Sequence, residues 1–261
     1  MDRIFAWITG LWHSRLLRLL VVGVLASLLL IPVAAIDGLI HERMTQRDAA
    51  HDEVTATWGG PQRIAGPVLI VPYDRVSQVT QKDGRVQELR RSYRLRVLPE
   101  QVAIDSKVRT ELRRRGMYQI TLFTAETKFS GSFARPDPSA LGIEPSDVYW
   151  DRAELVVELS EPRALRQQVH LSWGAKATSF EPGAGDQRSV PGATRGIHAP
   201  VQVSPGVTRF SFQLAHAGSR ELRFAPVGKS NQVSVRADWP HPSFQGQWLP
   251  RTSTITNQGF Q

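Results

Sequence analysis

The sequence feature that most constrains the fold is an uncharged run near the N-terminus. Leu19–Ile36 reads LLVVGVLASLLLIPVAAI, 18 residues without a charged side chain. As an α-helix this run covers about 27 Å, close to the roughly 30 Å hydrocarbon core of a bilayer. We therefore predict a transmembrane helix over residues 19–36, preceded by a stub of residues 1–18. The alternative is a cleaved signal peptide with Val33 and Ala35 at the cleavage site, whose apolar part is usually shorter, about 7–15 residues.

The charges on either side of this run predict its orientation. Residues 1–18 contain three arginines and one aspartate, whereas residues 37–53 contain two arginines and five acidic residues. The positive-inside rule therefore places the N-terminus in the cytoplasm of a bacterium and the residues after 36 in the periplasm, with the helix in the inner membrane. Of the formal charge of +8, +6 remains after residue 36. A nucleic-acid partner is not expected for a domain outside the cytoplasm.

The rest of the chain is predicted to be a helical stalk followed by a β-rich domain. Residues 37–60 continue the helix until Gly59-Gly60-Pro61 ends it. Residues 61–261 show about eight short apolar or alternating runs between Gly and Pro turns, which is typical of a sandwich-like or open-barrel fold. Glu181–Pro205 is rich in Gly, Pro, Ser and Ala and is predicted to be a long loop. The predicted strands include Val68–Val71, Tyr118–Lys128, Trp150–Leu159, Val169–Trp173, Phe210–His216, Leu222–Ala225 and Val233–Trp239.

One hairpin is predicted in more detail. Lys82-Asp83-Gly84-Arg85 has the Asp-Gly pair that favours a tight turn between antiparallel strands. The return strand that follows alternates, so its two faces carry different side chains. One face is predicted to carry Arg91, Tyr93, Leu95 and Val97, and the other Arg90, Ser92, Arg94 and Arg96.

Two arginine clusters are candidate contacts for an anionic partner. Arg90, Arg94 and Arg96 share a predicted strand face, and Arg113-Arg114-Arg115 precede Gly116 in a predicted turn. Arginines near an anionic lipid surface each contribute about 1 kcal/mol to binding. An anionic lipid or another anionic envelope component is the functional interpretation. A solvated strand face is the alternative that we favour, because a run of charge carries no specificity of its own.

A proline-stiffened aromatic segment is the candidate contact for a protein partner. The segment from Ala237 to Pro250 places two tryptophans and a phenylalanine beside X-Pro bonds, which fix the backbone as extended or turned. The favoured interpretation is a structural plug, and the functional one is a partner contact. The candidate contact residues are Trp239, His241, Phe244 and Trp248.

The sequence offers no recognisable catalytic motif, metal site or cofactor site. The chain has no cysteine, which excludes thiol catalysis and Cys-ligated metals. Gly228-Lys229-Ser230 copies the end of a phosphate-binding loop, but Arg223 stands where that loop needs a glycine. No two of the seven histidines have the i, i+4 spacing of a helical metal site. No catalytic residue, metal ligand or cofactor is therefore predicted.

Several motifs resemble those of one known family. The segment Ala237–Phe260, with Asp-Trp-Pro-His-Pro-Ser-Phe at residues 238–244 and a closing Gly259-Phe260, resembles CreD, the inner-membrane cell-envelope-integrity proteins. Gly60-Pro61-Gln62 and Gly196-Ile197-His198 match the family earlier in the chain, whereas Glu161–Leu165 departs from its pattern. The resemblance implies an N-terminal membrane helix, a β-rich periplasmic region and a later bundle of membrane helices. This chain has no second long apolar run, so it is expected to correspond to the N-terminal part of such a protein.

The resemblance also implies a function. It implies an envelope-integrity or envelope-stress-response protein that binds or scaffolds in the inner membrane and catalyses no known reaction. Two alternatives remain from the residues alone: a periplasmic enzyme acting on glycan or lipid, and a secreted ligand-binding β domain. An enzyme would need convergent carboxylates or a group with a perturbed pKa in a pocket.

Overall fold

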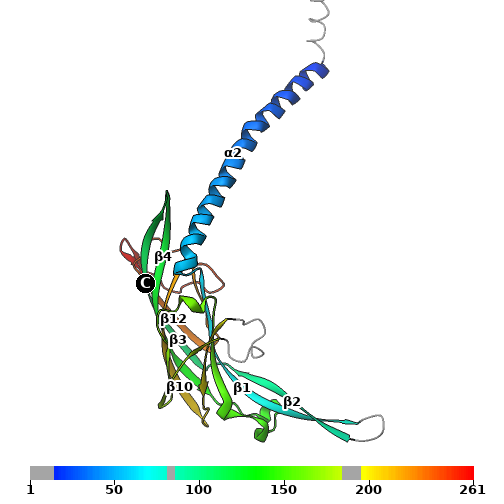
Figure 1. Ribbon diagram of the computed structural model, residues 1–261, viewed down its shortest axis with the longest axis vertical. Helices are drawn as coiled ribbons and strands as arrows, with labels where there is room; N and C mark the ends of the chain where they lie inside the picture. Colours follow the sequence, from blue (N-terminus) through cyan, green and yellow to red (C-terminus); the bar gives the residue numbers. More distant parts are fainter. Residues whose placement is uncertain (1–14, 81–85, 184–194) are drawn as a thin grey trace, which may run out of the picture. The chain divides into compact units, whose positions relative to one another are not determined.

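The structure, a computed structural model, describes residues 15–80, 86–183 and 195–261, and the chain divides into two units, 1–53 and 54–261. The described residues of the first unit all belong to helix α2 (Arg15–Trp58), which runs through Pro32 and ends before Gly59 (Figure 1). Within the described ranges, α2 is the one helix long and apolar enough to cross a membrane. The predicted apolar helix and the helix after it therefore form one continuous helix, which is long and apolar enough to cross a membrane.

The second unit, called the β domain here, is built from two sheets. Short 3-10 helices join the strands at Ser139–Leu141, Pro145–Asp147, Trp150–Arg152 and Pro162–Ala164. The first sheet has the order β11 (Leu222–Ala225), β1 (Gln62–Thr80), β5 (Ala153–Leu159), β9 (Gly196–Val201) and β8 (Glu181–Pro182), with β2 (Val86–Val97) also paired to β1. The second has the order β13 (Ile255–Thr256), β14 (Gly259–Phe260), β12 (Ser230–Ala237), β3 (Gln101–Arg115), β4 (Tyr118–Ala134), β10 (Val207–Ser219), β6 (His170–Trp173) and β7 (Lys176–Ser179).

One hydrophobic core joins the inner faces of the two sheets. Leu69 and Leu155 enter it from the first sheet, and Phe129, Phe133 and Leu171 enter it from the second. Alternating side chains of both sheets fill this layer, as in a β-sandwich. The mainly β, sandwich-like fold is confirmed, but several strands are much longer than the short runs that we predicted.

The predicted hairpin is present as β1 and β2. The two strands pair antiparallel from Leu69 with Val97 to Thr80 with Val86, and the register has no irregularity. The predicted turn at residues 82–85 lies outside the described residues. Tyr73 stacks on Tyr93 with ring centroids 5.6 Å apart, on the face where the alternation predicted Tyr93.

Two predictions about loops and turns are wrong. The predicted loop Glu181–Pro205 contains β8 and β9, and β9 lies inside the first sheet because Ile197, Ala199 and Val201 alternate into the core. Arg113–Arg115 are not in a turn, because β3 continues to Arg115 and the turn is formed by Gly116 and Met117. The positive φ of Gly116 permits that tight turn. β3 was not predicted as a strand, because its many polar residues obscure the alternation of buried and exposed positions.

Candidate functional site

The two arginine clusters lie at opposite ends of the β domain. In Figure 1 the hairpin tip between β3 and β4 is at the end that holds the last turn of α2, which we call the helix-side end. The hairpin of β1 and β2 extends at the other end, and residues 74–80 and 86–92 are called the arm. Arg113–Arg115 therefore belong to the helix-side end, and Arg90 belongs to the arm. The two clusters are therefore separate candidate contacts.

Trp58, the last residue of α2, is held between two arginines of the β domain. The guanidinium of Arg113 lies 4.5 Å from the centre of its ring, and that of Arg166 lies 4.8 Å from it. The indole Nε1–H donates a hydrogen bond of 3.2 Å to the carbonyl of Phe123. Each cation–π contact at a partly exposed site is worth about 0.5–1 kcal/mol, so these contacts fix the helix end on the β domain.

The buried face changes along β4 close to this contact. Ile120 and Leu122 are buried on the face that also carries Arg113, because Arg113 pairs with Ile120 in the ladder. From Phe123 onward the other face is buried: Phe123 and Ala125 pack with Val108 in a small cluster of their own, and Phe129 and Phe133 enter the main core. The hydrogen bond from Trp58 to the carbonyl of Phe123 lies at this change of face.

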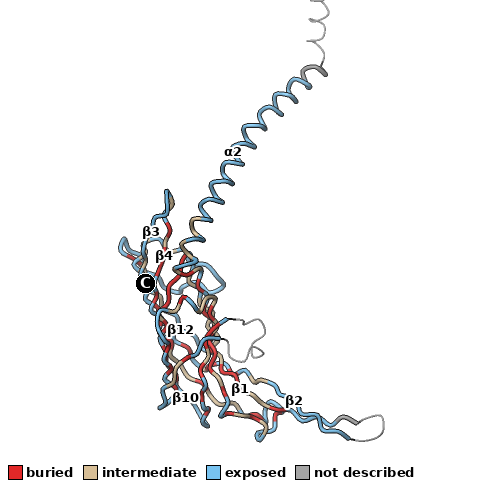
Figure 2. Tube along the Cα trace, viewed as in Figure 1, coloured by how far each residue is buried: buried red, intermediate tan, exposed pale blue. Residues whose placement is uncertain are grey.

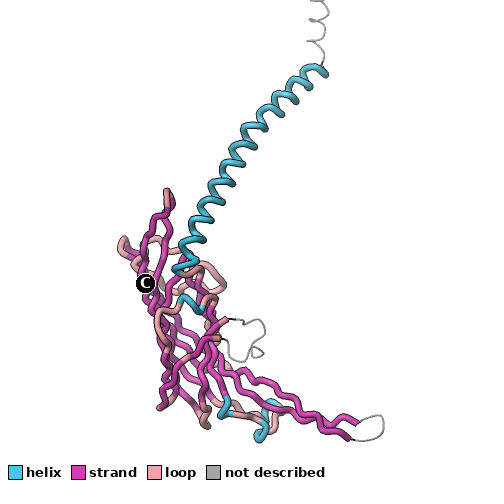
Figure 3. The backbone as a smooth tube through the Cα atoms, viewed as in Figure 1, coloured by secondary structure: helices cyan, strands magenta, loops and turns pink. Residues whose placement is uncertain are grey.

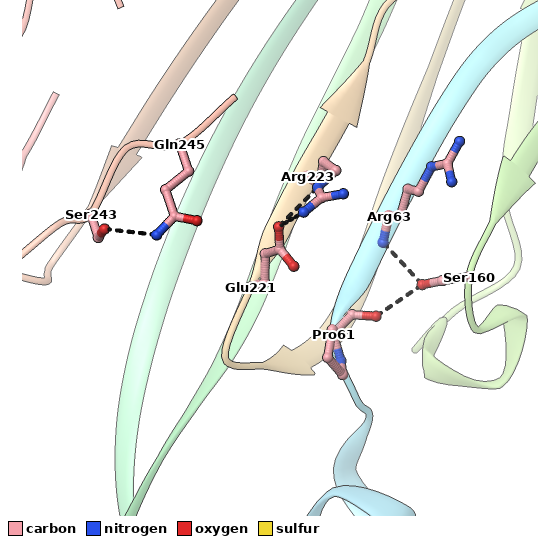
Figure 4. A network of polar contacts seen from close by, with 7 residues as sticks. All are labelled: Pro61, Arg63, Ser160, Glu221, Arg223, Ser243 and Gln245. Carbon is pink, nitrogen blue, oxygen red and sulfur yellow. Dashed lines mark hydrogen bonds and ion pairs between the residues drawn. The ribbon is translucent and has the colours of Figure 1, made fainter. Parts of the chain in front are cut away.

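A second set of contacts holds the chain where it leaves α2. The backbone N–H of Gly60 donates to the Glu161 carboxylate at 2.9 Å. The hydroxyl of Ser160 donates to the carbonyl of Pro61 and accepts from the N–H of Arg63 (Figure 4). Gly59 has a φ of +132°, and a Cβ atom there would lie 2.9 Å from the carbonyl oxygen of Ala217. This junction was not predicted, because its partners are about 100 residues apart in the sequence.

The arm contains a compact polar network around Asp74. Ser92 Oγ donates to Asp74 at 2.6 Å, Tyr149 donates to its other oxygen at 2.9 Å, and Arg90 lies 3.7 Å from it. The hydrogen bonds from Ser92 and Tyr149 hold the pKa of Asp74 below its usual value, and the bond to Asp74 raises the pKa of Tyr149. Arg90 thus already has an ion-pair partner within the domain, Asp74. Arg94 and Arg96 share its face, as predicted, because the register is continuous.

The predicted aromatic segment follows β12 as a loop, as Figure 3 shows, and it begins beside the β3–β4 hairpin. Asp238 accepts hydrogen bonds from the N–H and the hydroxyl of Thr110 at 2.7 and 2.8 Å. Trp239 is half-buried, and its Nε1–H donates to the carbonyl of the exposed His241 at 2.7 Å. Phe244 packs edge-on against Phe260 at 5.4 Å. The start of the segment is therefore tied to the second sheet.

The later part of the segment does not behave as a plug. Trp248 is 89% exposed and Leu249 is 62% exposed. The tip of the neighbouring hairpin also exposes large apolar side chains, with Leu112 at 56% and Met117 at 71%. Figure 2 shows the hairpin tip and the C-terminal strands at the same end of the β domain, largely in the colour of exposed residues. Large apolar side chains are thus exposed on both segments, which is a feature of binding surfaces when such side chains gather in one patch.

The imidazole of His216 is buried without a hydrogen bond. His216 of β10 is 3% exposed, and neither ring nitrogen has a partner. Its ring lies edge-on to that of Phe123 at 6.4 Å. Burial lowers the pKa of His216 to about 4, so the imidazole is neutral at pH 7. Among the described residues, no three His, Asp or Glu side chains gather in a way that could hold a metal ion.

Comparison with known proteins identifies the family. The family described as "Inner membrane protein CreD" matches residues 14–261, nearly the whole chain. The chain belongs to the CreD family. It is 26% identical over 238 residues to the inner membrane protein CreD of Escherichia coli (strain K12), covering 90% of this chain and 51% of that protein. The chain thus spans about half the length of this CreD relative. No solved structure matches the chain significantly.

Membership of the CreD family and the apolar helix α2 together support an inner-membrane location. The resemblance stated from the Asp-Trp-Pro-His-Pro-Ser-Phe run is confirmed. The turn at Glu161–Leu165, where the sequence departs from the expected CreD pattern, holds Gly60 through Glu161. The next residue, Arg166, donates a hydrogen bond to the carbonyl of Trp58.

Proposed function

We propose that the chain acts in the cell envelope by binding or scaffolding. Its N-terminus lies in the cytoplasm, α2 spans the inner membrane over residues 19–36, and the β domain lies in the periplasm. The support for this orientation is the charge difference between residues 1–18 and 37–53. The proposed role is in envelope integrity or the envelope stress response, as the resemblance to CreD proteins implies.

The observation that carries a binding role is the exposure of Trp248. A tryptophan that is 89% exposed on a proline-stiffened loop provides a large apolar contact at low cost in conformational entropy. Together with His241, Phe244 and the half-buried Trp239 it forms the proposed partner contact at the helix-side end. The two arginine clusters are the proposed contacts with anionic components, one cluster at each end.

The test is photocrosslinking in intact cells of the bacterium that produces the protein. A photoreactive residue replaces Trp248 in one variant, Arg94 of β2 in a second and Val207 in a control. Val207 is apolar and 67% exposed, and it lies outside all proposed contacts. A binding function predicts crosslinked envelope products, of lipid or protein, from position 94 or 248 and none from position 207. The absence of products from both test positions would contradict it.

A further inference from the structure

The outer face of the second sheet has a small cavity, separate from every contact proposed above. Its volume is about 90 Å³, and it lies over β3, β4 and β10. The chain that follows the 3-10 helix at Pro162–Ala164 closes one side of it. The side chains around the cavity are those of Lys107, Arg109, Thr124, Glu126, Arg166 and Ala215. Because three of these six side chains are basic, the cavity is a candidate site for an anion.

The register of the second sheet places these side chains on one face. Glu126 of β4 lies opposite Lys107 of β3 on one side and opposite Ala215 of β10 on the other. Thr124, two positions earlier on β4, lies opposite Arg109. Side chains directly opposite each other in an antiparallel ladder share a face, and their Cβ atoms are about 4.5–5.5 Å apart. The two basic residues of β3 are therefore neighbours at the edge of the cavity.

The core lies on the opposite face of the same strands. Val108 and Ala125, in the row between the two cavity rows, are buried in a small cluster with Phe123. His216 lies opposite Ala125 in that row, and its ring contacts the ring of Phe123. The imidazole therefore lies on the core side of the sheet, whereas the basic side chains of the cavity lie on the outer side.

Differences in side-chain size produce the cavity. Ala215 and Thr124 are short and form its floor, whereas the side chains of Lys107 and Arg109 are long and form its rim. The backbone N–H of Arg166 donates to the carbonyl of Ala215 at 2.8 Å, which holds the third basic residue beside β10. The floor is therefore surrounded by basic groups from two sides of the sheet.

Trp58 orders the guanidinium of Arg166. The guanidinium lies 4.8 Å from the centre of the indole ring, and its Nη2 donates to the carbonyl of Trp58 at 3.4 Å. Trp58 belongs to the same unit as the β domain, 54–261, so this contact lies within one unit. A charged side chain that is already ordered loses less conformational entropy when a ligand binds.

The cavity carries an excess of positive charge. The three basic side chains face one carboxylate, that of Glu126, which leaves a net charge of +2. Within residues 15–80, 86–183 and 195–261, neither Lys107 nor Arg109 has an ion-pair partner. Arg236, opposite Lys107 on β12, is paired with Asp105 at 3.2 Å. Like charges that gather in this way repel one another, and a bound anion relieves the repulsion.

We infer that this cavity binds a phosphate group. A phosphate monoester carries a charge of about −1.5 to −2 at pH 7, which matches the net charge of the cavity better than the single charge of a carboxylate. Guanidinium groups donate paired hydrogen bonds to phosphate oxygens, and the lysine and the threonine supply further donors. The phosphate is either free or the end group of a larger envelope molecule. This inference goes beyond the proposed function and does not depend on the membrane anchoring.

The test is isothermal titration calorimetry of the full chain in an uncharged detergent at low ionic strength. Inorganic phosphate is expected to bind at least about tenfold more tightly than acetate. Glycerol 3-phosphate distinguishes the two sources: binding as tight as that of inorganic phosphate indicates the end group of a larger molecule, and much weaker binding indicates free phosphate. The absence of phosphate binding, or equal binding of acetate, would overturn the inference.

Charge variants locate the binding. Arg109→Gln is expected to weaken phosphate binding about tenfold, and Glu126→Gln is expected to tighten it about threefold, because it removes a like charge from the cavity. Lys128→Gln is the matched control, since Lys128 is exposed on the same face of β4 but outside the cavity. It should change the affinity by less than about twofold. All three replaced residues are exposed, so the fold is expected to stay intact, as near-UV circular dichroism would verify.

Equal weakening in Arg109→Gln and Lys128→Gln would show binding to the general positive charge of the domain, and it would overturn the proposed site. Weaker binding in Glu126→Gln would do the same. Crosslinking from position 94 or 248 in cells does not involve these residues. A failure of the phosphate site would therefore leave the proposed binding function standing, and the two proposals can be told apart.

Discussion

The guanidinium of Arg113 lies 4.5 Å over the ring of Trp58, which joins the end of the long helix to the tip of a hairpin in the β domain. Arg113 also donates to Glu111 at 3.0 Å. Arg113, which the sequence analysis names as a candidate contact for an anionic partner, thus has a structural role. Its neighbours Arg114 and Arg115 remain the proposed contacts with an anionic partner.

Replacing Trp58 is expected to destabilise the β domain. Trp58→Ala removes two cation–π contacts and one hydrogen bond, so the free energy of unfolding should fall by about 2–3 kcal/mol. Trp58→Phe keeps a ring but loses the hydrogen bond, and it should cost less than half as much. Urea unfolding of the detergent-solubilised chain, followed by near-UV circular dichroism, measures both. Trp248→Ala is the control and should stay within about 0.5 kcal/mol of the natural sequence, because Trp248 is exposed.

Gly59 should tolerate no side chain. Gly59→Ala places a Cβ atom 2.9 Å from the carbonyl oxygen of Ala217, at a positive φ, and should lower the unfolding free energy by about 2–3 kcal/mol. Gly206 also has a positive φ, of +88°, but a Cβ atom there meets nothing within 4 Å. Gly206→Ala should therefore cost only about 1 kcal/mol. Equal thermal stability of the two variants would argue against the close approach at the helix junction.

His216 should make the β domain sensitive to acid. Its pKa is lowered to about 4 in the folded state, so the unfolded state binds the proton first as the pH falls below 6.5. Stability is lost between pH 6.5 and pH 4, by about 3 kcal/mol in total. His216→Leu should abolish this part of the loss, as seen by comparing urea unfolding of the two proteins at pH 7 and pH 4. If both proteins lose the same stability over that range, His216 is not the group responsible.

Asp74 should stabilise the arm in its ionised form. Its pKa is lowered by hydrogen bonds from Ser92 and Tyr149, so its contribution is present above the normal value of 3.8 and is lost as the pH falls through the lower folded value. Asp74→Asn should increase amide hydrogen exchange over residues 86–92 at pH 7. Asp105→Asn removes an exposed ion pair with Arg236 and should leave exchange in the arm unchanged. Unchanged exchange in Asp74→Asn would contradict the role of the network.

Local patterns predicted the parts of the fold that depend on neighbouring residues. The uncharged run predicted the helix, and Gly59-Gly60 predicted where it ends. The alternation of β2 predicted the face of the strand that carries Tyr93. β3 was missed because charged residues fill its outward positions and Ser106 takes an inward one, where it bonds to Thr127 at 2.8 Å. The strand β9 was missed because the glycine and proline content around it obscured three alternating apolar residues.

The residues of the candidate site are brought together by contacts between distant parts of the sequence, and no local sequence pattern predicts such contacts. Gly60 and Glu161 are 101 positions apart, and Thr110 and Asp238 are 128 apart. The aromatic segment was recognised from its residues, but whether it packs or stays exposed depends on which strands lie beside it. Only the structure separates the tied Trp239 from the exposed Trp248 and places the arginine clusters at opposite ends.

The most direct test of the account is the topology of the chain in the membrane. Single cysteines at Asp2 and Val207, placed in the cysteine-free chain, are treated in spheroplasts with a maleimide that does not cross membranes. The account predicts that Val207→Cys is labelled in intact spheroplasts and that Asp2→Cys is labelled only after lysis. Labelling of Asp2→Cys in intact spheroplasts, with Val207→Cys protected until lysis, would contradict it.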